Sequence, residues 1–208
     1  MILENIWTRR GFLGRSAIGA GAVISGEAAI QLLSTTRVWA AAAQGDLDIL
    51  NFALTLEYLE ADFYAQANKA ADTLFTDKKA KDLFALIGSD EAAHVQALSD
   101  TITKLGGKPV AKPSVKYPDG TFTDYKSFLK LSKTFEETGV GAYLGQAGAI
   151  TDPAILQAAA GIFGVECRHA ALVGKIAGLQ PEGGIYMGAT ETAKDKDAVL
   201  TAVKPFLA

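Results

Sequence analysis

The chain contains few of the residues from which several common functional sites are built. A single cysteine among 208 residues excludes a disulfide framework and a zinc site made of several cysteines. The 20 basic residues are outnumbered by 23 acidic ones, so we expect no basic surface and no nucleic-acid partner. A phosphate-binding glycine loop, a nucleophile elbow and strand-like alternation are also missing. What remains is a chain of helical character with only two histidines.

Residues 1–43 differ from the rest of the chain and predict an export signal. The pair Arg9 and Arg10 is followed by Gly-Phe-Leu and by a small, apolar run over residues 17–24, and alanines precede Gln44. A charged start, an apolar stretch and a small-residue end are typical of export signals. The arginine pair followed by Phe-Leu resembles a twin-arginine leader. We therefore expect an exported protein, located in the periplasm or at the cell surface.

A retained anchor or docking helix is the alternative interpretation of this segment. Glu27 and Gln31 interrupt the apolar run well short of the ~20 residues that a membrane-spanning helix needs. A retained segment would offer a surface to a membrane-associated partner. A homo-oligomer is the other protein partner that we consider.

Residues 44–180 carry the pattern of an all-α domain. Apolar residues recur at helical spacing and predict four long helices, over residues 46–71, 77–105, 124–150 and 153–178. The first and third connections are short, whereas the second, residues 108–123, is long and rich in proline. Two antiparallel hairpins joined by one long crossover between helices 2 and 3 form a ferritin-like four-helix bundle.

Local signals add detail to this bundle. Asp46 or Asp48 is expected to cap the first helix, and Pro153 suits the first turn of the fourth. Residues 181–208 form a C-terminal tail whose short helix, near residues 192–203, is expected to pack across one end of the bundle. Four glycines of the third helix predict close packing between helices; they are Gly139, Gly141, Gly145 and Gly148.

Both histidines follow a glutamate by three residues. Glu91 precedes His94 on the second expected helix, and Glu166 precedes His169 on the fourth. Residues three apart share one face of a helix, so each carboxylate and its imidazole can bind the same metal ion. Two such motifs on alternate helices predict a metal centre in the core of the bundle.

The other two helices each carry a glutamate followed seven residues later by a tyrosine. These pairs are Glu57 with Tyr64 and Glu136 with Tyr143. Seven residues are almost two helical turns, so each pair lies along one stripe. We expect the tyrosine hydroxyls to bond and orient carboxylates around the metal centre.

Four carboxylates and two imidazoles on facing helices predict a site for two iron or manganese ions. Two alternates exist because neighbouring positions can rotate inward. Glu60 could replace Glu57, and Glu137 could replace Glu136. The seven-residue offset to tyrosine favours Glu57 and Glu136, which leaves the alternates at the edge of the site or on a solvated face.

Four stretches resemble the ferritin-like domain family, which also includes plant desiccation-related and fungal stress-induced proteins. They are residues 54–64 (LTLEYLEADFY), 90–94 (DEAAH), 137–143 (ETGVGAY) and 165–169 (VECRH). The resemblance spans about residues 46–178. It implies the ferritin-like fold and assigns ligand roles to Glu57, Glu91, His94, Glu136, Glu166 and His169.

These patterns predict an exported stress-protection protein whose di-iron or di-manganese site reacts with dioxygen or hydrogen peroxide. It would act as an oxidase, a peroxidase or a catalase-like scavenger. The alternative is a metal-free, stress-associated structural or binding subunit of a cell-surface or membrane assembly, in which the polar core is catalytically idle. Iron storage needs a closed shell of many subunits, which a sequence cannot establish.

Overall fold

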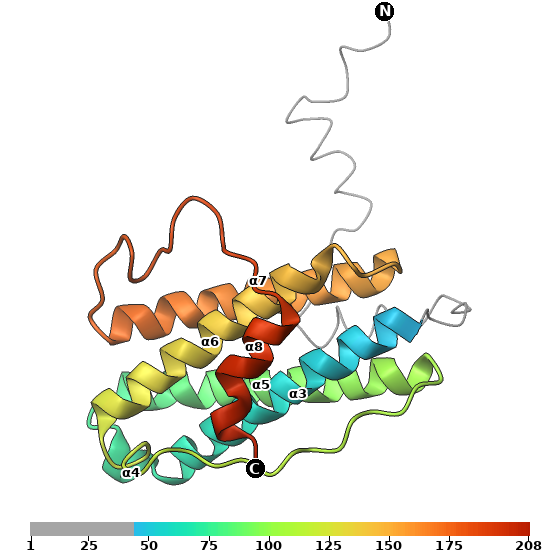
Figure 1. Cartoon of the computed structure of the whole chain (residues 1–208). Coiled ribbons are helices and arrows are strands. Elements are labelled where there is room, and N and C mark those ends of the chain that lie inside the picture. The colour runs from blue at the N-terminus through green and yellow to red at the C-terminus, as the bar shows by residue number, and fades with distance from the viewer. Residues whose placement is uncertain (1–43) are drawn as a thin grey trace, which may run out of the picture. The chain divides into compact units, whose positions relative to one another are not determined.

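The computed structural model describes residues 44–208, so the predicted leader and its export signal lie outside the described residues. The fold is an all-α four-helix bundle with a short C-terminal helix (Figure 1). Its elements are α3 (Gln44–Lys69), α4 (Ala71–Leu74), α5 (Lys78–Lys104), α6 (Tyr125–Ala147), α7 (Pro153–Ile176), α8 (Lys196–Val203) and the 3-10 turn η2 (Lys204–Phe206). The four long helices correspond to those predicted, with ends that differ by a few residues.

Aspartate caps start four of these helices. Asp77, Asp124, Asp152 and Asp195 each accept a hydrogen bond from a backbone N–H in the first turn of α5, α6, α7 and α8. Such caps satisfy donors that have no partner within the helix. Pro153 follows its cap directly at the start of α7, as predicted.

Asp46 has a different role from the predicted helix cap. It lies within the first turn of α3 and accepts hydrogen bonds from the backbone N–H groups of Thr151 and Asp152 and from the Thr151 hydroxyl, at 2.9–3.0 Å. Burial acts to raise the pKa of Asp46, but these hydrogen bonds lower it below its usual value. Asp46 therefore ties the start of α3 to the α6–α7 loop.

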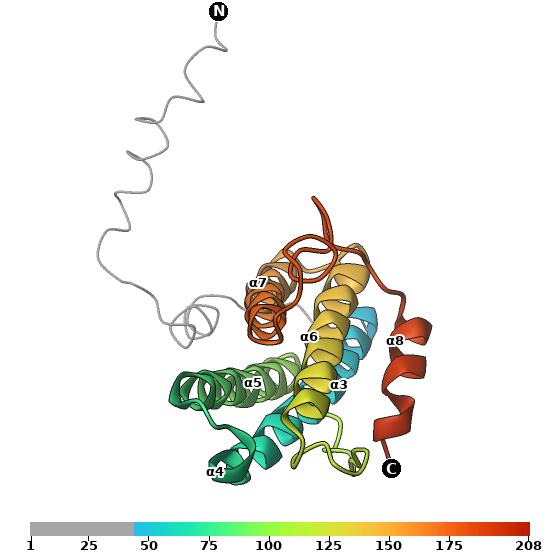
Figure 2. The ribbon, with the colours of Figure 1, turned by 90° about the vertical axis from the view of Figure 1, so that its left-hand side faces the viewer.

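The bundle consists of two hairpins, α3 with α5 and α6 with α7. A crossover over residues 105–124 runs along the bundle to connect them (Figures 1 and 2). α3 also packs on α6, and α5 on α7, so these two seams lie on opposite sides of the bundle. Among residues 44–208, no helix has the length and apolar character needed to cross a membrane.

The core contains two apolar clusters with a polar layer between them. One cluster holds Ile87 of α5 and Val173 of α7, and the other holds Leu98 of α5 and Ile162 of α7. The glutamate–histidine motifs on these two helices lie in sequence between the two clusters. The bundle thus encloses the polar layer in apolar surroundings that exclude water.

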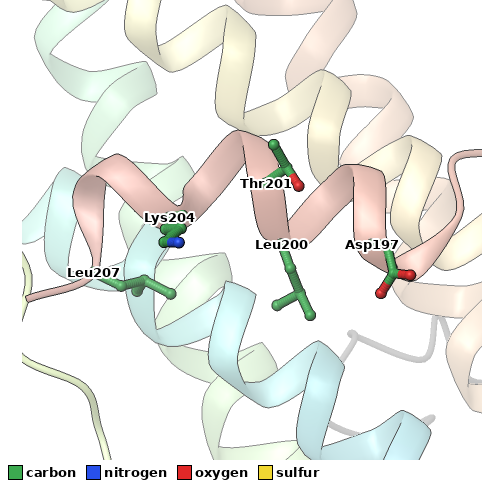
Figure 3. A pocket seen from close by; sticks show the side chains of 5 residues that line it. All are labelled: Asp197, Leu200, Thr201, Lys204 and Leu207. Carbon is green, nitrogen blue, oxygen red and sulfur yellow. The ribbon is translucent and has the colours of Figure 1, made fainter.

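The C-terminal helix packs along the side of the bundle and not across its end, contrary to our expectation. Val199 and Val203 of α8 belong to the same buried cluster as Phe52 of α3, and α8 also contacts α6. In Figure 2 this helix lies beside α6 and α3. An open depression next to it is lined by Asp197, Leu200, Thr201, Lys204 and Leu207 (Figure 3).

Gly141 and Gly145 of α6 make room for the segment before α8. The sequence predicts a different role for them, close packing between helices. The backbone N–H of Lys194 donates to the carbonyl of Gly141 at 2.9 Å. A Cβ on Gly145 would lie 1.9 Å from the Lys194 carbonyl oxygen, so this position has no room for a side chain. Gly148 has no neighbour within 4 Å of that position, and Gly139 faces the polar layer.

Candidate metal centre

All six predicted ligands meet inside the bundle. Glu57 comes from α3, Glu91 and His94 from α5, Glu136 from α6, and Glu166 and His169 from α7. The four glutamates are 0% exposed and the two histidines 6% and 4%. Residues this polar are almost never fully buried unless they are paired or bind a metal.

Their side chains form two overlapping groups of residues, each of which could hold a metal ion. In each group, one nitrogen or oxygen atom per residue lies within 4.8 Å of the others. The first group is Glu57, Glu91, His94 and Glu166, and the second is Glu91, Glu136, Glu166 and His169. Glu91 and Glu166 belong to both groups.

A proton on His94 cannot form good hydrogen bonds to all of the carboxylate oxygens around it. Its Nδ1 atom lies 3.2 Å from an oxygen of Glu57, 3.2 Å from one of Glu91 and 3.1 Å from one of Glu166. A single N–H can donate well to one of these oxygens, not to three. A metal ion, in contrast, accepts the imidazole nitrogen and several carboxylate oxygens together.

His169 is oriented by a carboxylate that the sequence did not single out. Its Nε2 lies 3.2 Å from Oδ2 of Asp90, a half-exposed residue of α5. Its Nδ1 lies 2.8 Å from Oε1 of Glu91 on the inner side of the ring. When Nε2–H donates to Asp90, Nδ1 carries the lone pair and is ready to bind a metal, a common arrangement for metal-binding histidines.

Tyr64 and Tyr143 connect the two hairpins by crossed hydrogen bonds. The hydroxyl of Tyr143 on α6 donates to Oε1 of Glu57 on α3 at 2.5 Å. The hydroxyl of Tyr64 on α3 donates to Oε1 of Glu136 on α6 and lies 2.7 Å from the Ser132 hydroxyl. Each tyrosine therefore orients the glutamate of the opposite hairpin, not the one on its own helix.

Several buried atoms in the layer form no well-aligned hydrogen bond within the described part of the chain, although His169 Nδ1 lies 2.8 Å from Glu91 Oε1 and His94 Nδ1 lies 3.1 Å from Glu166 Oε1. The atoms without such a bond are Oε1 of Glu60, Oε1 of Glu91, Oε2 of Glu136, both carboxylate oxygens of Glu166 and Nδ1 of His169. Buried polar atoms are normally bonded, and exceptions call for an explanation such as an ion. Every one of these atoms can serve as a ligand to a hard or borderline metal ion, so the donor set fits iron or manganese.

Without a metal, bound protons neutralise part of the negative charge of this layer. Burial acts to lower the pKa of both histidines, but the surrounding glutamates raise it by more. The pKa of His169 is raised to about 11, and that of His94 is raised further above its usual value. Burial raises the pKa of Glu91 to about 7 and that of Glu166 well above its usual value. Burial also acts to raise the pKa of Glu57, but the charge on His94 lowers it overall.

The two alternate ligands lie in different environments. The carboxylate of Glu137 points away from the centre and pairs with Lys133 at 3.0 Å. Glu60 is 3% exposed, and burial together with the charges of neighbouring carboxylates raises its pKa well above the usual value. Of the two places expected for Glu60, the edge of the site or a solvated face, the solvated face is wrong, because its side chain is buried in the polar layer.

Sequence reasoning assigned no role to Asp90 or Ser132. Asp90 immediately precedes Glu91, but its partner His169 lies 79 positions away on another helix. Ser132 lies one turn before Glu136 on α6, which was a local signal for a partner near that carboxylate.

Comparison with known proteins agrees with this geometry. The model of a family described as ferritin-like domain matches residues 45–179. The match includes all six predicted ligands and both tyrosines, and ends before α8. No curated protein matches the chain.

Proposed function

The chain belongs to the ferritin-like domain family, and we propose that its buried centre holds two iron or manganese ions. We also propose, from the pattern of residues 1–43, that the protein is exported. The observation that supports the metal centre most is the pair of buried groups of possible ligand atoms that share Glu91 and Glu166; several atoms of the residues in these groups also lack a well-aligned hydrogen bond among residues 44–208. In this proposal Glu57 and His94 would hold one ion, Glu136 and His169 would hold the other, and Glu91 and Glu166 would contribute to both.

The charges of this ligand set suit two divalent ions. Four carboxylates offset four positive charges, so the pair can be buried without a large net charge. Iron and manganese both accept imidazole and carboxylate ligands. When bound, these ions supply redox chemistry toward dioxygen or hydrogen peroxide, which is the oxidase- or peroxidase-type reaction that we propose for stress protection.

The protein's own residues prepare this centre. Tyr64 and Tyr143 hold Glu136 and Glu57 in place, and Asp90 holds the His169 ring so that Nδ1 faces inward. The apolar clusters above and below the polar layer keep water away. In a dry site, the fixed ligands keep their geometry when the charge of the centre changes.

The first experiment measures metal content. Residues 44–208, which include the whole described bundle, are loaded anaerobically with Fe²⁺ or Mn²⁺, desalted and analysed. We expect about two ions per chain, lost in a His94→Ala, His169→Ala variant and kept in Glu137→Gln, whose carboxylate faces Lys133. Loaded protein is then mixed with dioxygen or hydrogen peroxide and followed by optical absorption.

Two outcomes contradict different parts of the proposal. Absence of stoichiometric metal binding in the wild type would reject the metal centre and favour a structural or binding subunit. Binding of two ions without any reaction toward either oxidant would leave the centre in place and reject the oxidase or peroxidase activity. Export is tested separately, by asking whether the full chain expressed in a bacterium with a twin-arginine pathway reaches the periplasm.

A further inference from the structure

Glu60 is a fifth carboxylate in the centre and breaks the correspondence between the two hairpins. Glu57 on α3 corresponds to Glu136 on α6, since each precedes a tyrosine by seven residues. Glu60 follows Glu57 by three residues, and the residue that follows Glu136 by three is Gly139. One hairpin thus contributes a carboxylate where the other has no side chain.

Glu60 reaches the polar layer near Glu166, a residue that belongs to both ion-binding groups. The crossed tyrosine–glutamate bonds place α3 and α6 side by side and antiparallel. Along α3, Glu60 lies about halfway between Glu57 and Tyr64, and along α6 Gly139 has the equivalent place.

The space beside Gly139 is where two carboxylates face each other. A Cβ on Gly139 would lie 3.3 Å from Oε1 of Glu60 and 3.1 Å from Oε2 of Glu166. Both of these oxygens are buried and lack a hydrogen-bond partner within residues 44–208. The glycine therefore leaves room for two oxygens of like charge to share one small space.

No lysine, arginine or histidine among residues 44–208 forms an ion pair with the Glu60 carboxylate. The carboxylates of Glu166, Glu91, Glu136 and Glu57 act together with burial to raise its pKa. A charged carboxylate buried without a partner costs several kcal/mol, which is why Glu60 favours its protonated form when no metal is bound. A cation bound beside Glu60 would stabilise the charged carboxylate and remove that cost.

We propose that Glu60 is a seventh ligand of the centre, in addition to Glu57 and not in its place. It binds from the side of α3 and α6, whereas His94 and His169 bind from α5 and α7. The inference rests on the proposed function, because it requires that the centre holds two ions. It makes the centre asymmetric, with five carboxylates and two imidazoles.

Anaerobic titration of the full chain with Co²⁺ tests this role, because the visible absorption of Co²⁺ reports on its ligands. Wild type is compared with Glu60→Gln, which keeps the shape and removes the charge, and with Glu137→Gln as the matched control. We expect Glu60→Gln to bind one or both ions at least tenfold more weakly, with a changed Co²⁺ spectrum. Glu137→Gln should match wild type in affinity and spectrum.

Thermal unfolding separates a ligand role from a structural one. Without metal, Glu60→Gln should be about as stable as wild type, because the raised pKa already keeps the wild-type carboxyl protonated and uncharged. With Co²⁺, the variant should gain less stability than wild type. Unchanged affinity and spectrum in Glu60→Gln, or a variant that is destabilised without metal, would overturn the inference alone. A wild-type chain that binds no Co²⁺ would overturn the proposed function as well.

Discussion

At the scale of single residues, the crossed tyrosine bonds determine how the carboxylates are held. Tyr143→Phe removes the donor to Glu57, and Tyr64→Phe removes the donor to Glu136. Each leaves a buried carboxylate oxygen without its partner, which costs about 1–3 kcal/mol. Loss of an orienting partner typically lowers metal affinity about 10–100-fold. Titration with Fe²⁺ or Mn²⁺ and chemical denaturation measure these two effects.

Tyr58→Phe is the matched control for this experiment. Tyr58 is adjacent to Glu57 in sequence but is only partly buried and packs against the apolar cluster of Leu50 and Leu54. Its variant should keep both stability and metal affinity. If the Tyr64 and Tyr143 variants behave like Tyr58→Phe, the hydroxyls do not orient the carboxylates.

At the scale of elements, the contact between α6 and the segment before α8 depends on a missing side chain. Gly145→Ala places a Cβ 1.9 Å from the Lys194 carbonyl oxygen and must displace that segment. We expect a loss of about 1–3 kcal/mol of unfolding free energy, as for other overpacked positions, with the metal stoichiometry unchanged. Urea denaturation and metal analysis of the same samples measure both.

Gly161→Ala provides the comparison on α7. A Cβ at Gly161 meets nothing within 4 Å, so alanine should stabilise the helix by about 0.5–1 kcal/mol. Equal stability of the Gly145 and Gly161 variants would show that the C-terminal segment does not pack on α6 in solution.

At the scale of the whole molecule, metal binding and pH should act together on stability. In the metal-free protein the folded-state pKa of His169, about 11, exceeds its usual value of 6.5, and that of Glu91, about 7, exceeds 4.5. Both groups bind protons more tightly when folded. Their contribution to stability is therefore full at low pH and is lost as pH rises, for Glu91 between about 4.5 and 7 and for His169 between about 6.5 and 11.

Metal reverses this trend, because it binds the deprotonated ligands and competes with the protons. Saturation at a hundredfold excess over Kd adds about 2.7 kcal/mol of stability. We expect the rise in Tm caused by Mn²⁺ to grow from pH 5.5 to pH 8.5, while the Tm of the metal-free protein falls. Thermal scans with and without Mn²⁺ measure this, and a metal effect that is the same at every pH would contradict it.

The helices and the six candidate ligands could be predicted from the sequence because their signals are local. Apolar periodicity, the proline-rich crossover and aspartates at helix starts act over one or two turns. The Glu91–His94 and Glu166–His169 spacings place each pair on one helix face whatever packs against it. Membership of the ferritin-like domain family agrees with this interpretation of the bundle.

The sequence by itself determined which helices form and which polar faces they turn to the core. Only the tertiary structure decided how those faces meet. It decided that Tyr64 bonds to Glu136 and not to Glu57, and that Asp90 pairs with His169. It also decided that Glu60 is buried opposite Gly139 and that α8 lies along the side of the bundle. These contacts join residues on different helices. Helical spacing sets the direction of a side chain but not the partner it reaches, which depends on how the hairpins pack.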